Sequence, residues 1–226
     1  MLYSEYKKGD YMILDIIRHA DPDYANNTIT EFGKLEAKAL ADFLKDENID
    51  RIYTSPLGRA IDTAKPLCEI KRMDYVILPW TAESMDYMKR CTKPENCSYR
   101  FSILGGVEDY SDLTDEDRKA FLESLVKSSD EFLASLGYVR EGARYKAASP
   151  NDEHVLVFCH GGFGAAWISH LLMLPPGLGW CNIRLRTTGI TRFVFENNPE
   201  GFTFPVLHWL SSTSHISLAG LRLNNR

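Results

Sequence analysis

Short runs of residues that favour strands are spaced along the chain, at 12–17, 49–54, 75–78 and 154–159. Each run is too brief for a helix, and the first and last are almost continuously apolar, as in strands that are buried on both faces. Pro22 lies soon after the first run and bounds it. We therefore expect strands at these four places, with their ends marked by the first polar residues that follow.

Four helices are predicted among these strands. The first begins after Thr30, a residue that can cap it, and ends near Asn48. The second follows 55–60, the third carries an apolar stripe over 121–136, and the fourth runs from 161 until two prolines stop it. For the first two helices, the residues expected to face inward are Phe32, Leu35, Ala39, Phe43, Ala60, Ala64 and Leu67.

The alternation of strands and helices breaks at about 84–152, which we interpret as an insertion. Its first part, 85–112, mixes basic and aromatic residues and fits either a substrate-recognising lid or an irregular surface excursion. The polar segment 140–153 is expected to be a loop. Closely spaced strands, expected as hairpin-like additions at a sheet edge, follow at 184–186, 190–195 and 202–209.

The composition of the chain limits the kinds of partner that it is expected to bind. The chain has 226 residues, of which 44% are hydrophobic, enough to bury a substantial core. Its 26 basic and 31 acidic residues give a formal charge of -5, and there is no block of Lys and Arg. We therefore expect neither a nucleic acid nor a membrane surface as a partner. The sequence does not indicate the oligomeric state.

The compartment is expected to be the cytoplasm. The first residues lack the apolar core of a signal peptide, and no apolar run is long enough to span a bilayer. The five cysteines are odd in number and lack paired C-x-x-C spacing. This pattern indicates reduced thiols and disfavours a zinc site.

Candidate chemistry follows the predicted strands. Arg18 and His19 end the first strand: arginine is a fixed cation that suits phosphate, and a neutral imidazole can act as a nucleophile or base. Arg59 is expected in the first turn of a helix, where amide dipoles already favour an anion. His160 ends the last of the four strands, and Gly161 allows the next helix to approach an anion closely.

Two further polar residues follow strands. Glu83 is a candidate general acid, because a carboxyl group near a phosphate and away from bulk water can carry a proton. Ser55 lies at the carboxyl end of the second strand. Taken singly, each of these residues also fits an ordinary solvated strand end or surface position, and that alternative stays open.

Taken together, the residues resemble the histidine phosphatase superfamily, in its phosphoglycerate mutase-like branch. The resemblance extends from 12 to about 215 and leaves 84–152 as a variable insertion. The motifs that carry it, in this order along the chain, are Arg18-His19-Ala20, 29–33, 55–64, Glu83 and 159–162.

The resemblance implies a fold and a set of roles. We expect a single domain over 1–226, a three-layer α/β/α sandwich whose mostly parallel sheet has antiparallel additions and a helical insertion. His19 would form a phosphohistidine, with Glu83 and His160 as the other catalytic residues, and neither a metal nor a cofactor is expected. The residues expected to bind the substrate phosphate are Arg18, Arg59, Thr30, Ser55, Gly161 and His215.

Departures from the family pattern refine the expectation. Ala20 stands where the family usually has glycine, and 21–24 differs from the Glu-Ser continuation of the mutases. The Arg-x-Pro extension of the histidine acid phosphatases is also missing. The leading hypothesis is a metal-independent phosphomonoesterase for a small phosphorylated metabolite. A phosphoglycerate mutase-type phosphotransferase, a phosphoprotein phosphatase and a low-activity phosphate-binding regulatory module remain as alternatives.

Overall fold

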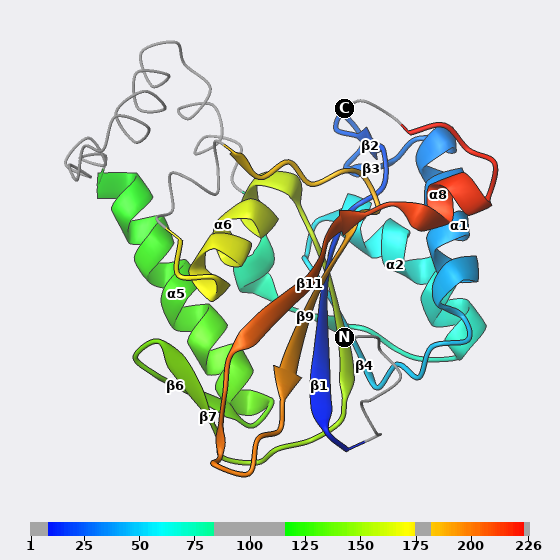
Figure 1. Ribbon diagram of the computed structural model, residues 1–226. Coiled ribbons are helices and arrows are strands. Elements are labelled where there is room, and N and C mark those ends of the chain that lie inside the picture. The colour runs from blue at the N-terminus through cyan, green and yellow to red at the C-terminus, as the bar shows by residue number, and fades with distance from the viewer. Residues whose placement is uncertain (1–8, 84–115, 175–181, 224–226) are drawn as a thin grey trace.

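A six-stranded sheet forms the centre of the computed structural model, which describes residues 9–83, 116–174 and 182–223 (Figure 1). The strand order is β11-β9-β1-β8-β4-β5. Four strands run parallel: β1 (Tyr11–Arg18), β8 (His154–Cys159), β4 (Arg51–Thr54) and β5 (Val76–Ile77). Two antiparallel strands extend the sheet beyond β1, namely β9 (Ile190–Glu196) and β11 (Pro205–Ser212).

Helices cover both faces of this sheet (Figure 1). One face carries α5 (Glu116–Ser135) and α6 (Gly161–Leu171), and the other carries α1 (Glu31–Leu44), α2 (Gly58–Lys71) and α8 (Ser214–Leu218). Each face has its own apolar cluster: Leu14 and Ile16 point to α6, whereas Ile17 points to the side of α1 and α2. The predicted three-layer α/β/α sandwich with a mostly parallel sheet is confirmed.

The first helix confirms its predicted start and all but one of the residues predicted to face inward. The Thr30 side chain accepts a hydrogen bond from the amide of Gly33, 3.0 Å away, and so caps α1. The helix ends at Leu44, before Asn48. Of the residues predicted to face inward, Ala39 is buried and Phe32 and Phe43 are partly buried, whereas the side chain of Leu35 is 52% exposed. The buried side also includes Ala37, Leu40, Ala41 and Leu44, whose spacing of three and four residues places them together.

The segment 140–153 is not wholly a loop, which corrects the prediction. β6 (Tyr138–Glu141) and β7 (Arg144–Ala147) form a hairpin, and β10 (Phe202–Thr203) pairs with β7. Tyr138 and Tyr145 are fully buried, while the residues that follow or precede them face solvent. This alternation marks strands, but the many charged residues between the two tyrosines hid it in the sequence.

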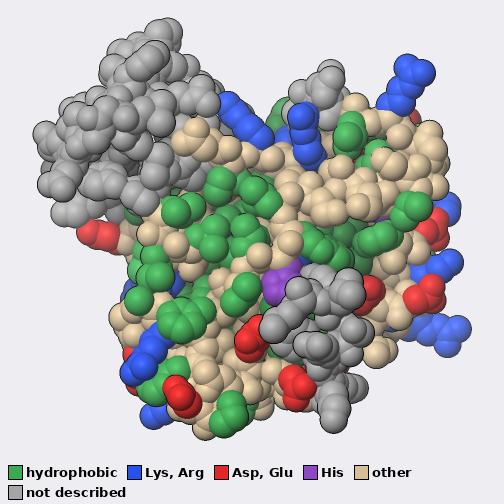
Figure 2. Space-filling view, in the orientation of Figure 1, with side chains coloured by type: hydrophobic (Ala, Val, Ile, Leu, Met, Phe, Trp, Pro, Cys, Tyr) green, Lys and Arg blue, Asp and Glu red, His purple; other side chains and the backbone are tan. Residues whose placement is uncertain are grey.

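Of the three strands predicted near the end of the chain, one is wrong and two are confirmed. Residues 184–186 do not form a strand, although 190–195 and 202–209 do fall in strands. The edge strand β11 exposes Val206 and Leu210 on a face where apolar side chains gather (Figure 2). Its pairing with β9 is interrupted twice by register shifts, an irregularity that discourages pairing with a further strand.

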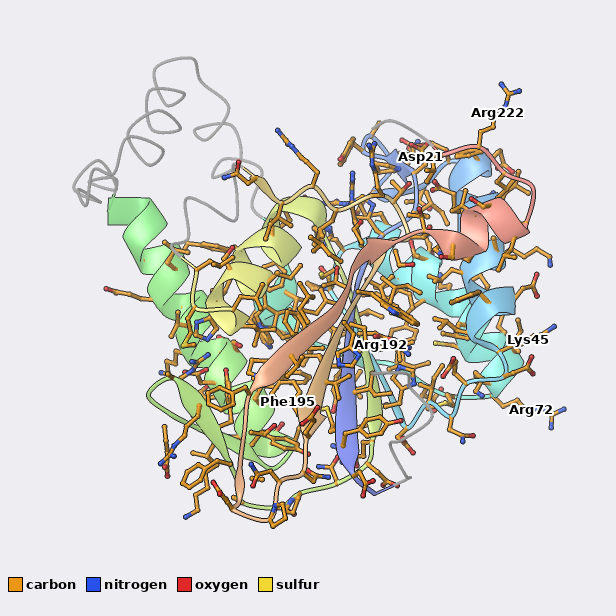
Figure 3. The ribbon with its side chains drawn as sticks, in the orientation of Figure 1. Asp21, Lys45, Arg72, Arg192, Phe195 and Arg222 are labelled. Atoms are coloured by element: carbon orange, nitrogen blue, oxygen red, sulfur yellow. The ribbon has the colours of Figure 1, made fainter. Side chains whose placement is uncertain are left out.

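Two short elements lie near the carboxyl ends of the parallel strands. β2 (Pro22–Asp23) and β3 (Thr28–Ile29) pair with each other directly after β1, and η2 (Pro79–Thr81) leads from β5 to Glu83. Figure 3 shows Asp21 near the upper end of the molecule and Arg192 near the middle of the sheet.

The segment 85–112 lies outside the described residues. Among the helices that are described, none has the length and apolarity required to cross a membrane.

Candidate active site

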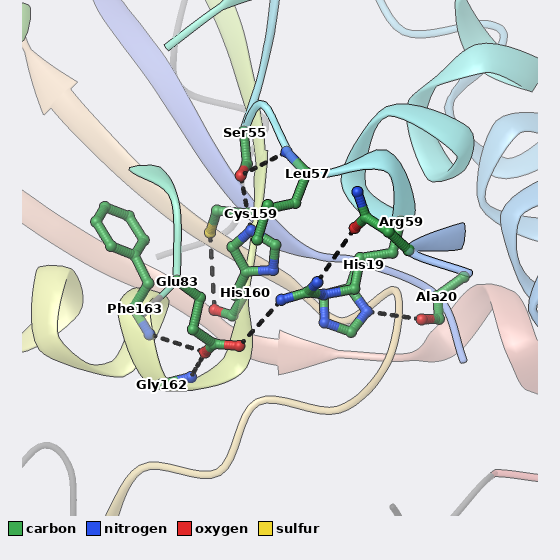
Figure 4. Close-up of polar contacts among 11 residues, drawn as sticks. His19, Ala20, Ser55, Leu57, Arg59, Glu83, Cys159, His160, Gly162 and Phe163 are labelled. Atoms are coloured by element: carbon green, nitrogen blue, oxygen red, sulfur yellow. Dashed lines mark hydrogen bonds and ion pairs between the residues drawn. The ribbon is translucent and has the colours of Figure 1, made fainter. Parts of the chain in front are cut away.

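Four polar residues from four different strand ends meet at one edge of the sheet (Figure 4). His19 follows β1, Ser55 follows β4 and His160 follows β8, while Glu83 follows η2 beyond β5. Because parallel strands all end at the same edge, a short run of sequence after each strand is enough to assemble the site. The side chains of all four are buried or nearly so.

The His19 ring is held in one tautomer. Its Nδ1 donates a hydrogen bond to the backbone oxygen of Ala20, 2.7 Å away, so that Nε2 carries the lone pair of the neutral ring. Burial lowers the pKa of His19 to about 3, against the Ala20 hydrogen bond, and the charges of Arg18 and Arg59 lower it further. A neutral imidazole with an anchored Nδ1 and an unprotonated Nε2 is suited to nucleophilic attack.

His160 lies beside His19, with their ring centroids 5.2 Å apart. Its Nε2 lies 2.7 Å from the Ser55 hydroxyl, which also accepts from the amide of Leu57. Burial lowers the pKa of His160 to about 2, and neighbouring positive charges add to the effect. Within the described residues the buried Nδ1 has no hydrogen-bond partner, so this atom is available to a bound molecule.

Two arginines supply positive charge. Arg59 is 5% exposed, and its contacts are long: Nη2 lies 3.5 Å from Glu83 Oε2, and Nη1 lies 3.5 Å from Asn27 Oδ1. Arg18 donates from Nη1 to the backbone oxygen of Leu185 at 2.7 Å, and its charge acts on both His19 and His160. A buried guanidinium with only long contacts can re-form short, charge-assisted bonds to an anion.

The amino end of α6 forms another wall of the site. Glu83 Oε1 accepts hydrogen bonds from the amides of Gly162 at 2.9 Å and Phe163 at 3.4 Å. A Cβ atom on Gly161 would lie 3.3 Å from Arg18 Nε, a tighter approach than most side chains make. Glycine at this position therefore lets the helix end and the arginine share one small space.

Thr30 and His215 form hydrogen bonds with residues other than these, among them Asp21 and Thr188 respectively. The Thr30 hydroxyl donates to Asp21 Oδ2 at 2.7 Å, in the turn after β1. His215 is 1% exposed, and its Nε2 lies 2.8 Å from the Thr188 hydroxyl, while burial lowers the pKa of His215 to about 4. Of the residues predicted to bind phosphate, these two make their described contacts with supporting residues.

Sequence reasoning missed four supporting residues. Glu36, which is 1% exposed, accepts from the Asp21 amide at 2.7 Å and from the Thr187 hydroxyl at 2.6 Å. Asn27 and Tyr24 lie beside the Arg59 guanidinium, and the Thr63 hydroxyl accepts from the Ala20 amide. Glu36 was detectable in principle, since a carboxylate on the buried face of an amphipathic helix needs internal partners.

The same pocket contains a possible metal-ligand set. His19, Glu83 and His160 each offer one ligand atom, and these three atoms lie within 4.8 Å of one another. Two imidazoles and a carboxylate are ligands that several divalent metals accept.

Comparisons with known proteins show which sequences resemble this chain. The model of the histidine phosphatase superfamily (branch 1) matches residues 14–95. A probable phosphoglycerate mutase GpmB from Proteus mirabilis is 23% identical over 216 residues, covering 89% of this chain and 94% of that protein. A protein of the same name from Yersinia enterocolitica is 24% identical over 202 residues, covering 87% of each.

Solved structures share the fold. A phosphoserine phosphatase mutant from Entamoeba histolytica in complex with phosphoserine aligns with a TM-score of 0.63 and 21% identity, over 91% of this chain and 99% of that one. A mycobacterial glucosyl-3-phosphoglycerate phosphatase aligns with a TM-score of 0.59 and 19% identity, over 89% and 100% of the two chains. At these identities the structures show a common fold, and the chemistry has to be argued from the site itself.

Proposed function

We propose that the chain, whose residues 14–95 match the model of the histidine phosphatase superfamily (branch 1), is a phosphomonoesterase that hydrolyses a small phosphorylated metabolite through a phosphohistidine. The observation that carries the proposal is the His19 ring, whose Nδ1 is anchored on Ala20 while Arg18, the buried Arg59 and His160 lie near it. A nucleophile and a set of donors for phosphate oxygens are thus together in one buried place.

In the first step, His19 Nε2 attacks phosphorus, a nitrogen–phosphorus bond forms and the bond to the ester oxygen breaks. Arg18, Arg59 and His160 Nδ1–H bind the nonbridging oxygens and offset the charge that develops on them. Ser55 supports this role, because its hydroxyl can donate to Nε2 of His160 and leave the proton on Nδ1. Glu83 gives its proton to the leaving oxygen.

In the second step, Glu83 as a carboxylate takes a proton from water, which attacks phosphorus as the nitrogen–phosphorus bond breaks. Inorganic phosphate leaves, and His19 and the protonated Glu83 are regenerated. The amides of Gly162 and Phe163 support the carboxylate in this step, since both donate to its Oε1 atom. No metal takes part in either step of this proposal.

The substrate class rests on the relatives. Structures of the Entamoeba protein are described with phosphoserine and with 3-phosphoglyceric acid, both small phosphorylated carboxylates. The matched Proteus protein is covered over 94% of its length, which supports a single domain of this kind with an insertion at about 84–152. Because the curated relatives are named as probable mutases, phosphoryl transfer within a phosphoglycerate is the second candidate.

The test is phosphate release from p-nitrophenyl phosphate in excess EDTA, by the wild type and by His19→Ala and Glu83→Gln. We expect wild-type activity in EDTA, and a fall of at least about 10³-fold in His19→Ala. The matched histidine control is His208→Asn, because His208 does not lie at these strand ends. Activity retained by His19→Ala would refute the mechanism. An inactive wild type that moves phosphate between positions of phosphoglycerate would identify a mutase, and release from phosphopeptides alone would identify a protein phosphatase. Phosphate binding without any of these reactions would identify a regulatory module.

A further inference from the structure

The candidate active site has the donor set of a zinc site. Zn²⁺ binds nitrogen and carboxylate oxygen at about 2.0–2.2 Å in a tetrahedral arrangement, so that its ligands stand about 3.4 Å apart. The ligand atoms of His19, Glu83 and His160 already lie within 4.8 Å of one another. Modest rotation of three side chains is therefore enough to close them around one ion.

Each of the three groups is supported on the side away from the shared space. His19 Nδ1 donates to Ala20, His160 Nε2 contacts Ser55, and Glu83 Oε1 accepts from the Gly162 amide. Such outer contacts are the usual means by which proteins orient metal-binding histidines and carboxylates. His160 adds a second, independent observation, because its fully buried Nδ1 has no hydrogen-bond partner in the described part of the chain.

Ser55 makes both uses of His160 chemically consistent. Its hydroxyl can donate to Nε2, which leaves a proton on Nδ1, or accept from Nε2–H, which leaves a lone pair on Nδ1. In the first state Nδ1 is a donor to a phosphate oxygen, and in the second it is a metal ligand. His160 can therefore adopt the tautomer that suits a phosphate oxygen or the tautomer that suits a metal ion.

We propose that this pocket also binds Zn²⁺, through Nε2 of His19, Nδ1 of His160 and a carboxylate oxygen of Glu83, and that the bound ion is inhibitory. The inhibition rests on the proposed function, because zinc on Nε2 would occupy the atom that attacks phosphorus. Zinc and the phosphoryl group would then compete for one place.

The two arginines shape the expected affinity. Arg59 Nη2 lies 3.5 Å from Glu83 Oε2, so a metal at Glu83 replaces a long and weak ion pair. The positive charges of Arg18 and Arg59 oppose the cation and favour an anion, such as hydroxide or chloride, as its fourth ligand. Zinc is thus expected to bind reversibly and more weakly than at a closed structural site.

Direct binding tests the proposal without using activity. The wild type, freed of metal by EDTA and then dialysed, is titrated with Zn²⁺ by calorimetry and with Co²⁺ by visible absorption, in the absence of substrate. We expect one site per chain, and we expect His160→Asn and Glu83→Gln each to weaken binding at least about tenfold. His208→Asn, the matched histidine change outside the pocket, is expected to bind as the wild type does.

A second arm addresses the thiols and the inhibition. Cys91, Cys97 and Cys181 are other possible zinc ligands in the sequence, so the titration is repeated after alkylation with iodoacetamide, and retained binding is expected. Zn²⁺ is expected to raise the apparent KM for p-nitrophenyl phosphate and to leave kcat unchanged. Equal affinity in all variants, or loss of binding on alkylation, would overturn the site. Binding without any phosphatase activity would keep the site and remove the proposed function.

Discussion

Two buried polar clusters share the strands β1 and β8 but differ in how completely their hydrogen bonds are formed. In the middle of the sheet, Asp15 accepts from Arg192 Nε and Nη2 and from His154 Nε2, all at 2.8 Å. The Arg192 guanidinium also stacks on the ring of Trp209, 4.1 Å from its centroid. At the strand ends, the contacts of Arg59 measure 3.5 Å.

The difference indicates that the cluster in the middle of the sheet stabilises the fold, whereas the cluster at the strand ends is suited to binding a phosphate. Burial raises the pKa of Asp15, but the hydrogen bonds from Arg192 and His154 outweigh it and hold that pKa below its usual value of 3.8. The charge in the middle of the sheet is thus matched inside the protein. At the strand ends, the contacts of the Arg59 guanidinium with Asn27 and Glu83 are long, as expected where an incoming phosphate provides closer partners.

The largest predicted effect breaks the middle cluster. Asp15→Asn leaves Arg192 buried without its counter-charge and is expected to lower the free energy of unfolding by about 3–5 kcal/mol. The measurement is urea denaturation, with kcat per folded molecule expected to stay unchanged. Asp42→Asn, which removes the exposed partner of Lys38, is the matched control and should leave stability as it was. A stable Asp15→Asn protein would show that the two clusters do not differ as argued.

The next effect breaks the strand-end cluster. Arg59→Met is expected to cost about 2–4 kcal/mol of transition-state stabilisation, because one donor to the phosphate oxygens is lost. Steady-state kinetics should show this fall in kcat/KM, while urea denaturation should show little change, since the contacts of Arg59 in the free protein are long. An unchanged kcat/KM would remove Arg59 from the mechanism.

A smaller effect is predicted for Glu36, whose hydrogen bonds join Asp21, close to His19 in the chain, to Thr187. Glu36→Gln keeps one acceptor oxygen but loses the second, so either the Asp21 amide or the Thr187 hydroxyl loses its carboxylate partner. We expect Glu36→Gln to lose about 1–2 kcal/mol of transition-state stabilisation. The loss should appear mostly as a lower kcat, with little change in KM. Thr187→Val, which removes one of the same hydrogen bonds, should reproduce part of the loss. A change in KM alone would indicate contact with substrate instead.

The smallest predicted effect is a dependence of stability on pH. Since the pKa of Asp15 is lower in the folded protein than its usual 3.8, the carboxylate stabilises the fold above 3.8. That contribution is lost as the pH falls below 3.8 and through the folded-state value. The urea midpoint of the wild type should therefore fall more steeply in acid than that of Asp15→Asn, and parallel curves would contradict the assignment.

Residues close in sequence to a strand end were predictable, and long-range partners were not. The hairpin 138–147 was missed because charged residues between its buried tyrosines hid the alternation, and Leu35 was wrongly assigned to the buried side of α1 because it is apolar yet exposed. The pairing of Asp15 with Arg192 spans 177 residues, and no local pattern announces it. Glu36 reaches Thr187 across 151 residues for the same reason.

The sequence by itself determined the order of strands and helices and the polar residues at the strand ends, because apolar periodicity and parallel pairing are local rules. It thereby identified the groups that meet around His19. The tertiary structure alone decided which nitrogen of each histidine is bonded to the protein, how long the contacts of Arg59 are, and that Thr30 and His215 bond to Asp21 and Thr188. Those features depend on contacts between segments far apart in the chain, which packing brings together only when the sheet is complete.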